Sequence, residues 1–270
     1  KKFGEATEIP LSNQPVVRAH HVVFVLDESI SMTSHWQDLI GAVRSFLNLR
    51  LKAGAHDMVS IVLFHTSART VCEMMPLLEC ESQLQNLLIQ ECGATSFGPA
   101  LIMAQSLLVQ GLLQPEYSPL LMFMSDGDAY DGEVGIDRMR TLCSEISQLT
   151  APGCKWEEVG EEPTSGIEIS NNALAEALHE KVDFTVEELI KFKVSNLSSD
   201  CYIKANRKYF KSSIAELQVK TIAFGSGASH DKLQRLAEPG GGEFLLASDG
   251  FQLKQCFRNA AASLVKTHFR

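Results

Sequence analysis

The chain is dominated by short apolar runs of strand length that alternate with segments of helical periodicity. Residues 22–26 read VVFVL, an unbroken apolar run typical of a strand whose two faces are both buried in a parallel sheet. Further strands are predicted over residues 58–64, at the start of 119–132, and over 217–224 and 244–247, with a shorter edge strand over 68–73. Apolar spacing predicts helices over residues 36–51, near 84–88, within 91–113, and over 136–149, 231–237 and 251–265. This alternation predicts a mostly parallel sheet covered by helices on both faces.

The alternation fails between residues 150 and 213. The stretch after Thr150 is acidic and interrupted by proline and glycine, and short helices are then predicted over residues 173–181 and 185–192. Residues 201–210 are typical of two short strands around a turn near Asn206. We therefore predict an N-terminal arm over residues 1–15, one domain over 16–270, and a small α+β insertion within it over 151–213.

The charge balance bears on the class of partner. The 24 basic and 33 acidic residues give a formal net charge of -9, which argues against a nucleic acid held by general electrostatic attraction.

The seven cysteines are scattered and include no C-x-x-C pair, so neither a disulfide framework nor a zinc knuckle is indicated. Free thiols suit a reducing compartment, and we expect an intracellular, cytoplasmic protein. No apolar run is long enough to predict a membrane segment. The first residue is Lys1, so we expect a fragment of a larger multidomain protein.

Three loops at predicted strand ends carry oxygen-bearing side chains. In an open α/β sheet, ligands bind beyond the carboxyl ends of the strands, near the point where the strand order reverses. The residues concerned are Asp27, Ser29 and Ser31 in the first loop, Thr95 and Ser96 in the second, and Ser125, Asp126 and Asp128 in the third. Oxygen ligands suit hard divalent cations such as Mg²⁺. Two carboxylates and three hydroxyls would leave a coordination position open for an incoming carboxylate.

The same residues carry a resemblance to a known family. DESIS (27–31) resembles D-x-S-x-S, the first element of the metal-ion-dependent adhesion site (MIDAS) of von Willebrand factor type A domains. GATSF (93–97) resembles the threonine element and FMSDG (123–127) the strand-end aspartate. The resemblance covers about residues 16–149 and 217–265. It implies a Rossmann-like three-layer α/β/α fold with a mostly parallel central sheet and one short antiparallel edge strand.

The resemblance also implies a function. A Mg²⁺ ion, with Mn²⁺ or Ca²⁺ as substitutes, would bind Asp27, Ser29, Ser31, Thr95 and Asp126, with the two aspartates acting mostly through water. A partner protein would supply a Glu or Asp to the open position, and no catalysis is expected. Glu28, Ser96 and Asp128 would lie at the rim of the site. Glu28 would add negative charge there, which favours cation capture and disfavours an acidic partner.

Other interpretations of these residues stay open at this point. Ser29 and Ser31 are ordinary helix-capping residues, and Asp128 and Asp131 fit a solvated acidic loop. Asp27 after a buried strand also resembles the nucleophile of Mg²⁺-dependent phosphotransferases of the haloacid dehalogenase type, although Ser29 stands where those enzymes carry a second aspartate. Finally, the insertion over residues 151–213 could be the recognition surface.

Overall fold

The computed structural model describes residues 17–112, 114, 116–127, 129–150, 216–225 and 230–264. The predicted arm, the insertion over residues 151–213 and Asp128 lie outside the described residues. The strands are β1 (His20–Asp27), β2 (Met58–Phe64), β3 (Ala68–Pro76), β4 (Ser118–Ser125), β5 (Gln218–Phe224) and β6 (Glu243–Ala247). The helices are α1 (Trp36–Lys52), α2 (Leu77–Leu87), α3 (Phe97–Gly111), α4 (Gly132–Thr150), α8 (His230–Ala237) and α9 (Gly250–Ser263), with 3₁₀ turns η2 (Ile30–His35) and η4 (Glu238–Gly240).

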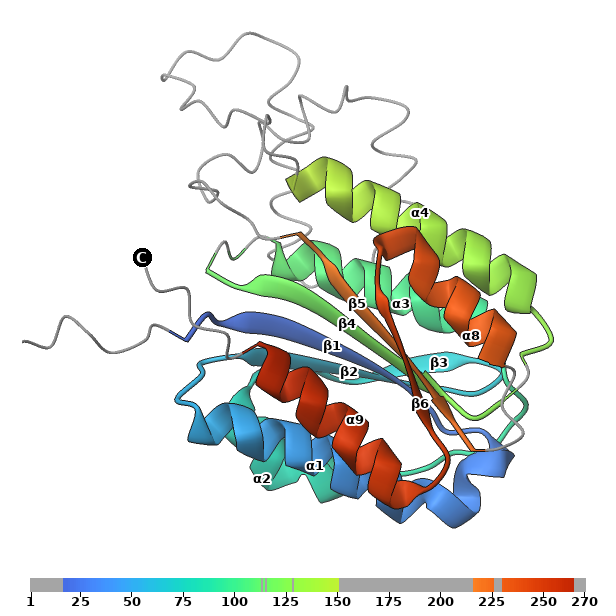
Figure 1. Cartoon of the computed structure of the whole chain (residues 1–270), viewed down its shortest axis with the longest axis horizontal. Helices are drawn as coiled ribbons and strands as arrows, with labels where there is room; N and C mark the ends of the chain where they lie inside the picture. The colour runs from blue at the N-terminus through green and yellow to red at the C-terminus, as the bar shows by residue number, and fades with distance from the viewer. Residues whose placement is uncertain are drawn as a thin grey trace, which may run out of the picture.

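The strands form one sheet in the order β3-β2-β1-β4-β5-β6. Neighbouring strands are parallel except β3, which runs antiparallel to β2 at the edge. Helices α1, α2 and α9 cover one face, and α3, α4 and α8 cover the other (Figure 1). The predicted fold class is therefore confirmed: a Rossmann-like three-layer α/β/α arrangement.

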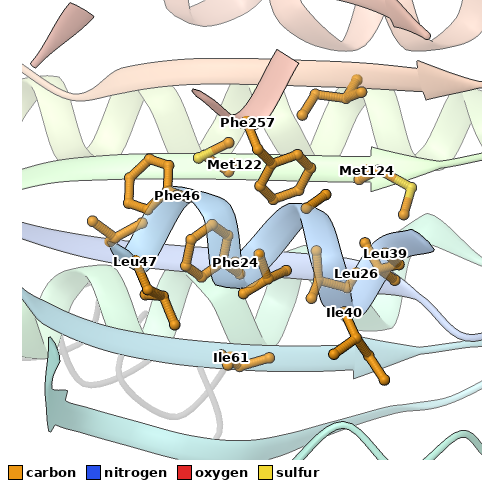
Figure 2. Packing of buried hydrophobic residues seen from close by; sticks show 14 of the residues in the cluster. Phe24, Leu26, Leu39, Ile40, Phe46, Leu47, Ile61, Met122, Met124 and Phe257 are labelled. Carbon is orange, nitrogen blue, oxygen red and sulfur yellow. The ribbon is translucent and has the colours of Figure 1, made fainter. Parts of the chain in front are cut away.

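Strand β1 is buried on both faces because its side chains alternate between two cores. Val22, Phe24 and Leu26 belong to the core under α1 and α9, whereas Val23 and Val25 belong to the core under α3 and α4. Phe24 lies between rings from two helices: Phe46 of α1 is edge-on at a centroid distance of 5.2 Å, and Phe257 of α9 is stacked at 6.0 Å (Figure 2). The uninterrupted apolar sequence of β1 is explained by this central position.

Three elements extend clearly beyond their predicted bounds. Helix α2 spans Leu77–Leu87, whereas the sequence predicts a short helix near residues 84–88. Strand β3 continues to Pro76 rather than ending at residue 73, and it contains irregular pairing with β2 around Ile61 and a positive φ of 44° at Met74. Helix α4 begins at Gly132 rather than at residue 136. Its first turn contains two glycines, which interrupt the apolar spacing. At Gly135 the helix lies so close to α3 that a Cβ atom would be 2.6 Å from Cβ of Phe97.

The strand order reverses between β1 and β4. The chain runs from β1 outward to β2 and β3, and then returns to β4 on the other side of β1. The carboxyl ends of β1 and β4 flank the crevice that this reversal creates. Asp27 ends β1 and Asp126 directly follows β4, so the topology brings these two predicted site residues to the same point.

Candidate metal centre

The oxygens of the first and third loops form a continuous hydrogen-bonded chain. Ser29 Oγ lies 3.0 Å from Ser31 Oγ, and Ser31 Oγ donates to Asp126 Oδ1 at 2.9 Å. Asp27 is held from both sides: Oδ1 accepts the backbone N–H of Ser29 at 2.8 Å, and Oδ2 accepts the hydroxyl of Ser125 at 2.6 Å. Residues almost a hundred positions apart are thus gathered at the switch point.

The second loop brings Thr95 to the same place. A Cβ atom at Gly127 would lie 2.9 Å from Thr95 Oγ1, so the threonine hydroxyl faces the backbone directly after Asp126. The backbone N–H of Tyr130 also donates to the carbonyl of Thr95 at 3.3 Å. Only glycine at position 127 leaves room for this approach, which explains the S-D-G sequence at the end of β4.

Both carboxylates are in surroundings that disfavour negative charge. The pKa of Asp27 is raised to about 6, chiefly by burial; the nearby Asp126 also raises it, and the hydrogen bonds from Ser125 and Ser29 act in the opposite direction. Burial also raises the pKa of Asp126. Among the described lysines and arginines, none forms an ion pair with either residue. A divalent cation would supply the missing positive charge, and the all-oxygen donor set suits Mg²⁺ or a similar hard ion.

The predicted rim residues lie differently from the five predicted ligands. Glu28 is fully buried and accepts hydrogen bonds from Arg69 Nη2 at 2.9 Å and from the backbone N–H of Glu91 at 2.8 Å. Its charge is therefore compensated inside the protein rather than presented beside Asp126. Ser96 is buried and donates to Asp131 at 2.6 Å.

A second acid-rich group near the first loop is neutralised by an arginine side chain. Ligand atoms of Glu28, His65 and Glu91 lie within 4.8 Å of one another. The guanidinium of Arg69 contacts Glu28 and also Glu91, at 3.3 Å between Nε and Oε1. Because Arg69 neutralises both carboxylates, this group is better explained as an ion-pair cluster that ties β3 to the first and second loops.

The helix-capping interpretation of the two serines is wrong. Ser29 precedes η2 and His35 precedes α1, but neither side chain makes a capping hydrogen bond. The hydroxyls of Ser29 and Ser31 instead contact each other and Asp126. These hydroxyls therefore belong to the oxygen cluster rather than to the helix that follows.

Asp131 has a role that sequence analysis missed. Its carboxylate accepts the Ser96 hydroxyl at 2.6 Å and the backbone N–H groups of Phe97 and Gly98, each at 2.8 Å. It caps α3 and joins the third loop to the loop that carries Thr95, rather than lying in a solvated acidic loop. No local pattern reveals this role, because its partners lie more than thirty residues earlier in the chain.

Replacing Asp131 with alanine is expected to lower both stability and cation affinity. The loss of three accepted hydrogen bonds should cost about 2 kcal/mol of unfolding free energy. Release of the second loop should weaken Mn²⁺ binding about tenfold, since a misplaced ligand loses much of its contribution. Thermal unfolding and Mn²⁺ titration measure the two effects. Asp137→Ala, at an exposed position of α4, is the control, and unchanged Mn²⁺ affinity in Asp131→Ala would restrict Asp131 to helix capping.

Comparison with known proteins assigns the family. Two models of the von Willebrand factor type A domain match the chain, one over residues 22–128 and the other over residues 164–244. The chain contains a von Willebrand factor type A domain. A search of curated protein sequences finds no match.

Solved structures share the fold of this von Willebrand factor type A domain at low identity. A von Willebrand factor type A protein from Catenulispora acidiphila has a TM-score of 0.53 at 13% identity, covering 92% of this chain and 43% of its own. The pilus adhesin SpaC from Lactobacillus rhamnosus GG has a TM-score of 0.53 at 11% identity, covering 94% and 31%. Proximal thread matrix protein 1 from the mussel byssus, with a zinc-occupied MIDAS motif, has a TM-score of 0.50 at 12% identity, covering 94% and 50%. The chain thus spans half or less of each of these proteins.

Proposed function

We propose that this domain is a Mg²⁺-dependent protein interaction module that binds an acidic residue of a partner protein. The observation that carries the proposal is the convergence of five oxygen-bearing side chains at the switch point, with two carboxylates that form no ion pair with a described lysine or arginine. These side chains are Asp27, Ser29, Ser31, Thr95 and Asp126. The zinc-occupied MIDAS motif of the mussel byssus protein, which has a similar fold, supports metal binding at this place.

The residues of the site have distinct parts in this proposal. The bound cation would supply positive charge and an open coordination position for a carboxylate. Ser29, Ser31 and Thr95 would contact the ion through neutral hydroxyls, which leave its charge available to a partner. Asp27 and Asp126 would hold the ion chiefly through water, and Ser125 orients Asp27. Mn²⁺ and Ca²⁺ share the preference for oxygen and are the expected substitutes.

Selection of peptides from a random display library tests the partner chemistry. The full 270-residue chain is immobilised and panned in Mg²⁺, and in parallel with a chelator. We expect cation-dependent enrichment of peptides that contain Asp or Glu, and loss of that enrichment in Asp126→Ala, which removes one carboxylate near the protein surface. Enrichment without an acidic residue, or enrichment unaffected by the chelator, would contradict the proposal.

The phosphotransferase interpretation of Asp27 is less well supported. Its side chain is fully buried, and both carboxylate oxygens accept hydrogen bonds. A nucleophile must reach the phosphorus atom, and Ser29 lacks the carboxyl group that would act as general acid. An assay with a generic aryl phosphate separates the two functions, because turnover that Asp27→Asn abolishes would favour the enzyme.

The role of the insertion and the cellular location of the protein are still predictions. Recognition by the insertion over residues 151–213 concerns a segment outside the described residues, and deletion of residues 153–211 followed by repeated panning would test it. The intracellular location is likewise untested. In the part of the chain that the structure describes, no helix is both long and apolar enough to cross a membrane.

A further inference from the structure

Apolar side chains are exposed around the oxygen cluster. Ile30 is 70% exposed between the two serines of the first loop, and Tyr130 is 70% exposed in the third loop. Ile89, at 63%, directly precedes Gln90, whose side-chain amide donates to the carbonyl of Ser29 at 3.0 Å. Large exposed apolar side chains that gather in one region, rather than lying singly, mark an interaction surface.

Backbone hydrogen bonds hold the residues that carry these side chains close to the site. The backbone N–H of Ile30 donates to the carbonyl of Gly93 at 3.1 Å, which joins the first loop to the segment after Ile89. The backbone N–H of Tyr130 donates to the carbonyl of Thr95. Val134, 56% exposed, lies one turn further along, where its Cγ1 atom approaches Gly98. We name Ile30, Ile89, Tyr130 and Val134 the apolar rim.

The rim gathers most of the large apolar side chains that the described surface exposes. Seven such side chains are exposed among the described residues, and four of them belong to the rim. Leu78 is 67% exposed but lies at the opposite end of the sheet, because it follows Pro76, which pairs with the first residue of β2. This difference in position makes Leu78 a matched control.

The charges around the rim are unfavourable for a strongly acidic partner. Residues 27–35, 89–98 and 125–135 contain no lysine or arginine. Three cations contact these loops from other elements: Arg69 pairs with Glu28 and Glu91, Arg235 pairs with Glu133, and Lys232 donates to the backbone carbonyl of Ala129 at 3.2 Å. A bound divalent cation would place positive charge between the first and third loops, where these residues supply none of their own, and one carboxylate would satisfy it.

We propose that the apolar rim selects a partner segment in which a single Asp or Glu is flanked by apolar residues. The inference rests on the proposed function, since the cation receives the acidic side chain. The flanking residues would pack on Ile30 on one side and on Tyr130 and Val134 on the other, so that removal of this apolar surface from water adds to the affinity. A segment with several acidic residues would meet apolar side chains instead of positive charge and would bind less well.

The same display library tests this inference through the residues beside the acid. With the unchanged chain in Mg²⁺, we expect enriched peptides to carry Leu, Ile, Phe, Tyr or Trp next to the acidic position. A synthetic peptide of the enriched sequence should bind about tenfold more weakly to the double variant Ile30→Ser/Tyr130→Ser, the loss typical of central interface residues. Leu78→Ser should bind it with unchanged affinity.

The outcomes distinguish this inference from the proposed function. Cation-dependent enrichment of acidic peptides without apolar neighbours, or of polyacidic peptides, would overturn the inference and leave the proposed function intact. Equal peptide affinity of the double variant and the unchanged chain would also overturn it. Absence of any cation-dependent enrichment would overturn both. Mn²⁺ affinity, measured on the double variant, should stay unchanged and shows that its cation site is preserved.

Discussion

Replacing Asp27 with asparagine is expected to raise the thermal midpoint of the cation-free chain and to abolish its response to Mg²⁺. The Asp27 side chain is fully buried, and no described lysine or arginine pairs with it. Burial raises its pKa from 3.8 to about 6. An amide of the same shape carries no charge and keeps an oxygen that can accept a hydrogen bond, so it avoids the cost of burying an anion.

The sign and size of this effect follow from the pKa. Because the folded-state pKa is raised, the carboxyl contributes stability fully below about pH 3.8 and loses that contribution as the pH rises through about 6. Well above pH 6, the raised pKa of Asp27 lowers the unfolding free energy by about 3 kcal/mol relative to its value at low pH. We expect asparagine to recover about 2 kcal/mol of it, or about 5 °C in the thermal midpoint.

Thermal unfolding with a chelator, followed across pH, measures the prediction. The advantage of Asp27→Asn should be largest near pH 8 and should vanish near pH 4, where the aspartate is protonated. Asp137→Asn, at an exposed position, should change neither the midpoint nor the Mg²⁺ response. A lower midpoint for Asp27→Asn at high pH would show that the buried carboxylate does not destabilise the cation-free chain. A retained Mg²⁺ response would show that Asp27 is not needed for cation binding.

Among the substitutions proposed for this chain, replacing Arg50 with methionine is expected to lower the unfolding free energy most. Arg50 of α1 and Asp57 before β2 are both fully buried, and Nε donates to Oδ2 at 2.6 Å while Nη2 donates to Oδ1 at 2.9 Å. Asp57 also accepts the backbone N–H of His20, and Arg50 donates to the carbonyl of Arg18. The pair thus joins the end of α1 to the starts of β1 and β2.

Arg50→Met should lower the unfolding free energy by about 3–5 kcal/mol, because it leaves the Asp57 carboxylate buried without its partner. Chemical denaturation measures the loss. The double variant Arg50→Met/Asp57→Asn should lose less than the sum of the two single variants, since the unpaired charge is then absent. Arg44→Met, in the same helix with a half-exposed ion pair to Glu81, should cost less than about 1 kcal/mol. A similar loss in Arg44→Met and Arg50→Met would contradict this account.

The sequence predicts the layers of the fold well because the strands at its centre are chemically distinctive. Strand β1 is apolar on both faces, and only a parallel sheet between helix layers buries both. The starts of α2 and α4 are less distinctive. Gly132 and Gly135 interrupt the apolar spacing of α4 and allow close packing on neighbouring side chains, which a periodicity argument does not detect.

The site is partly predictable for a similar reason. Asp27, Ser29 and Ser31 form a local pattern, and Asp126 directly follows a recognisable strand. The contacts that organise the loops are not local: Arg69 reaches Glu28 from 41 residues away, and Asp131 reaches Phe97 from 34. Nothing in the sequence near Glu28 indicates that its side chain pairs with Arg69 rather than lying at the rim.

Counting the Mn²⁺ ions that bind to the chain tests whether the oxygens at the ends of β1 and β4 form a cation site. Mn²⁺ is titrated into the full chain and the free ion is measured by electron paramagnetic resonance, with Asp126→Ala as the matched variant. We expect one Mn²⁺ ion to bind, Mg²⁺ to displace it, and Asp126→Ala to lose this binding. Absence of such a site in the unchanged chain, or an equal affinity in Asp126→Ala, would show that these oxygens serve only as hydrogen-bond partners of the loops.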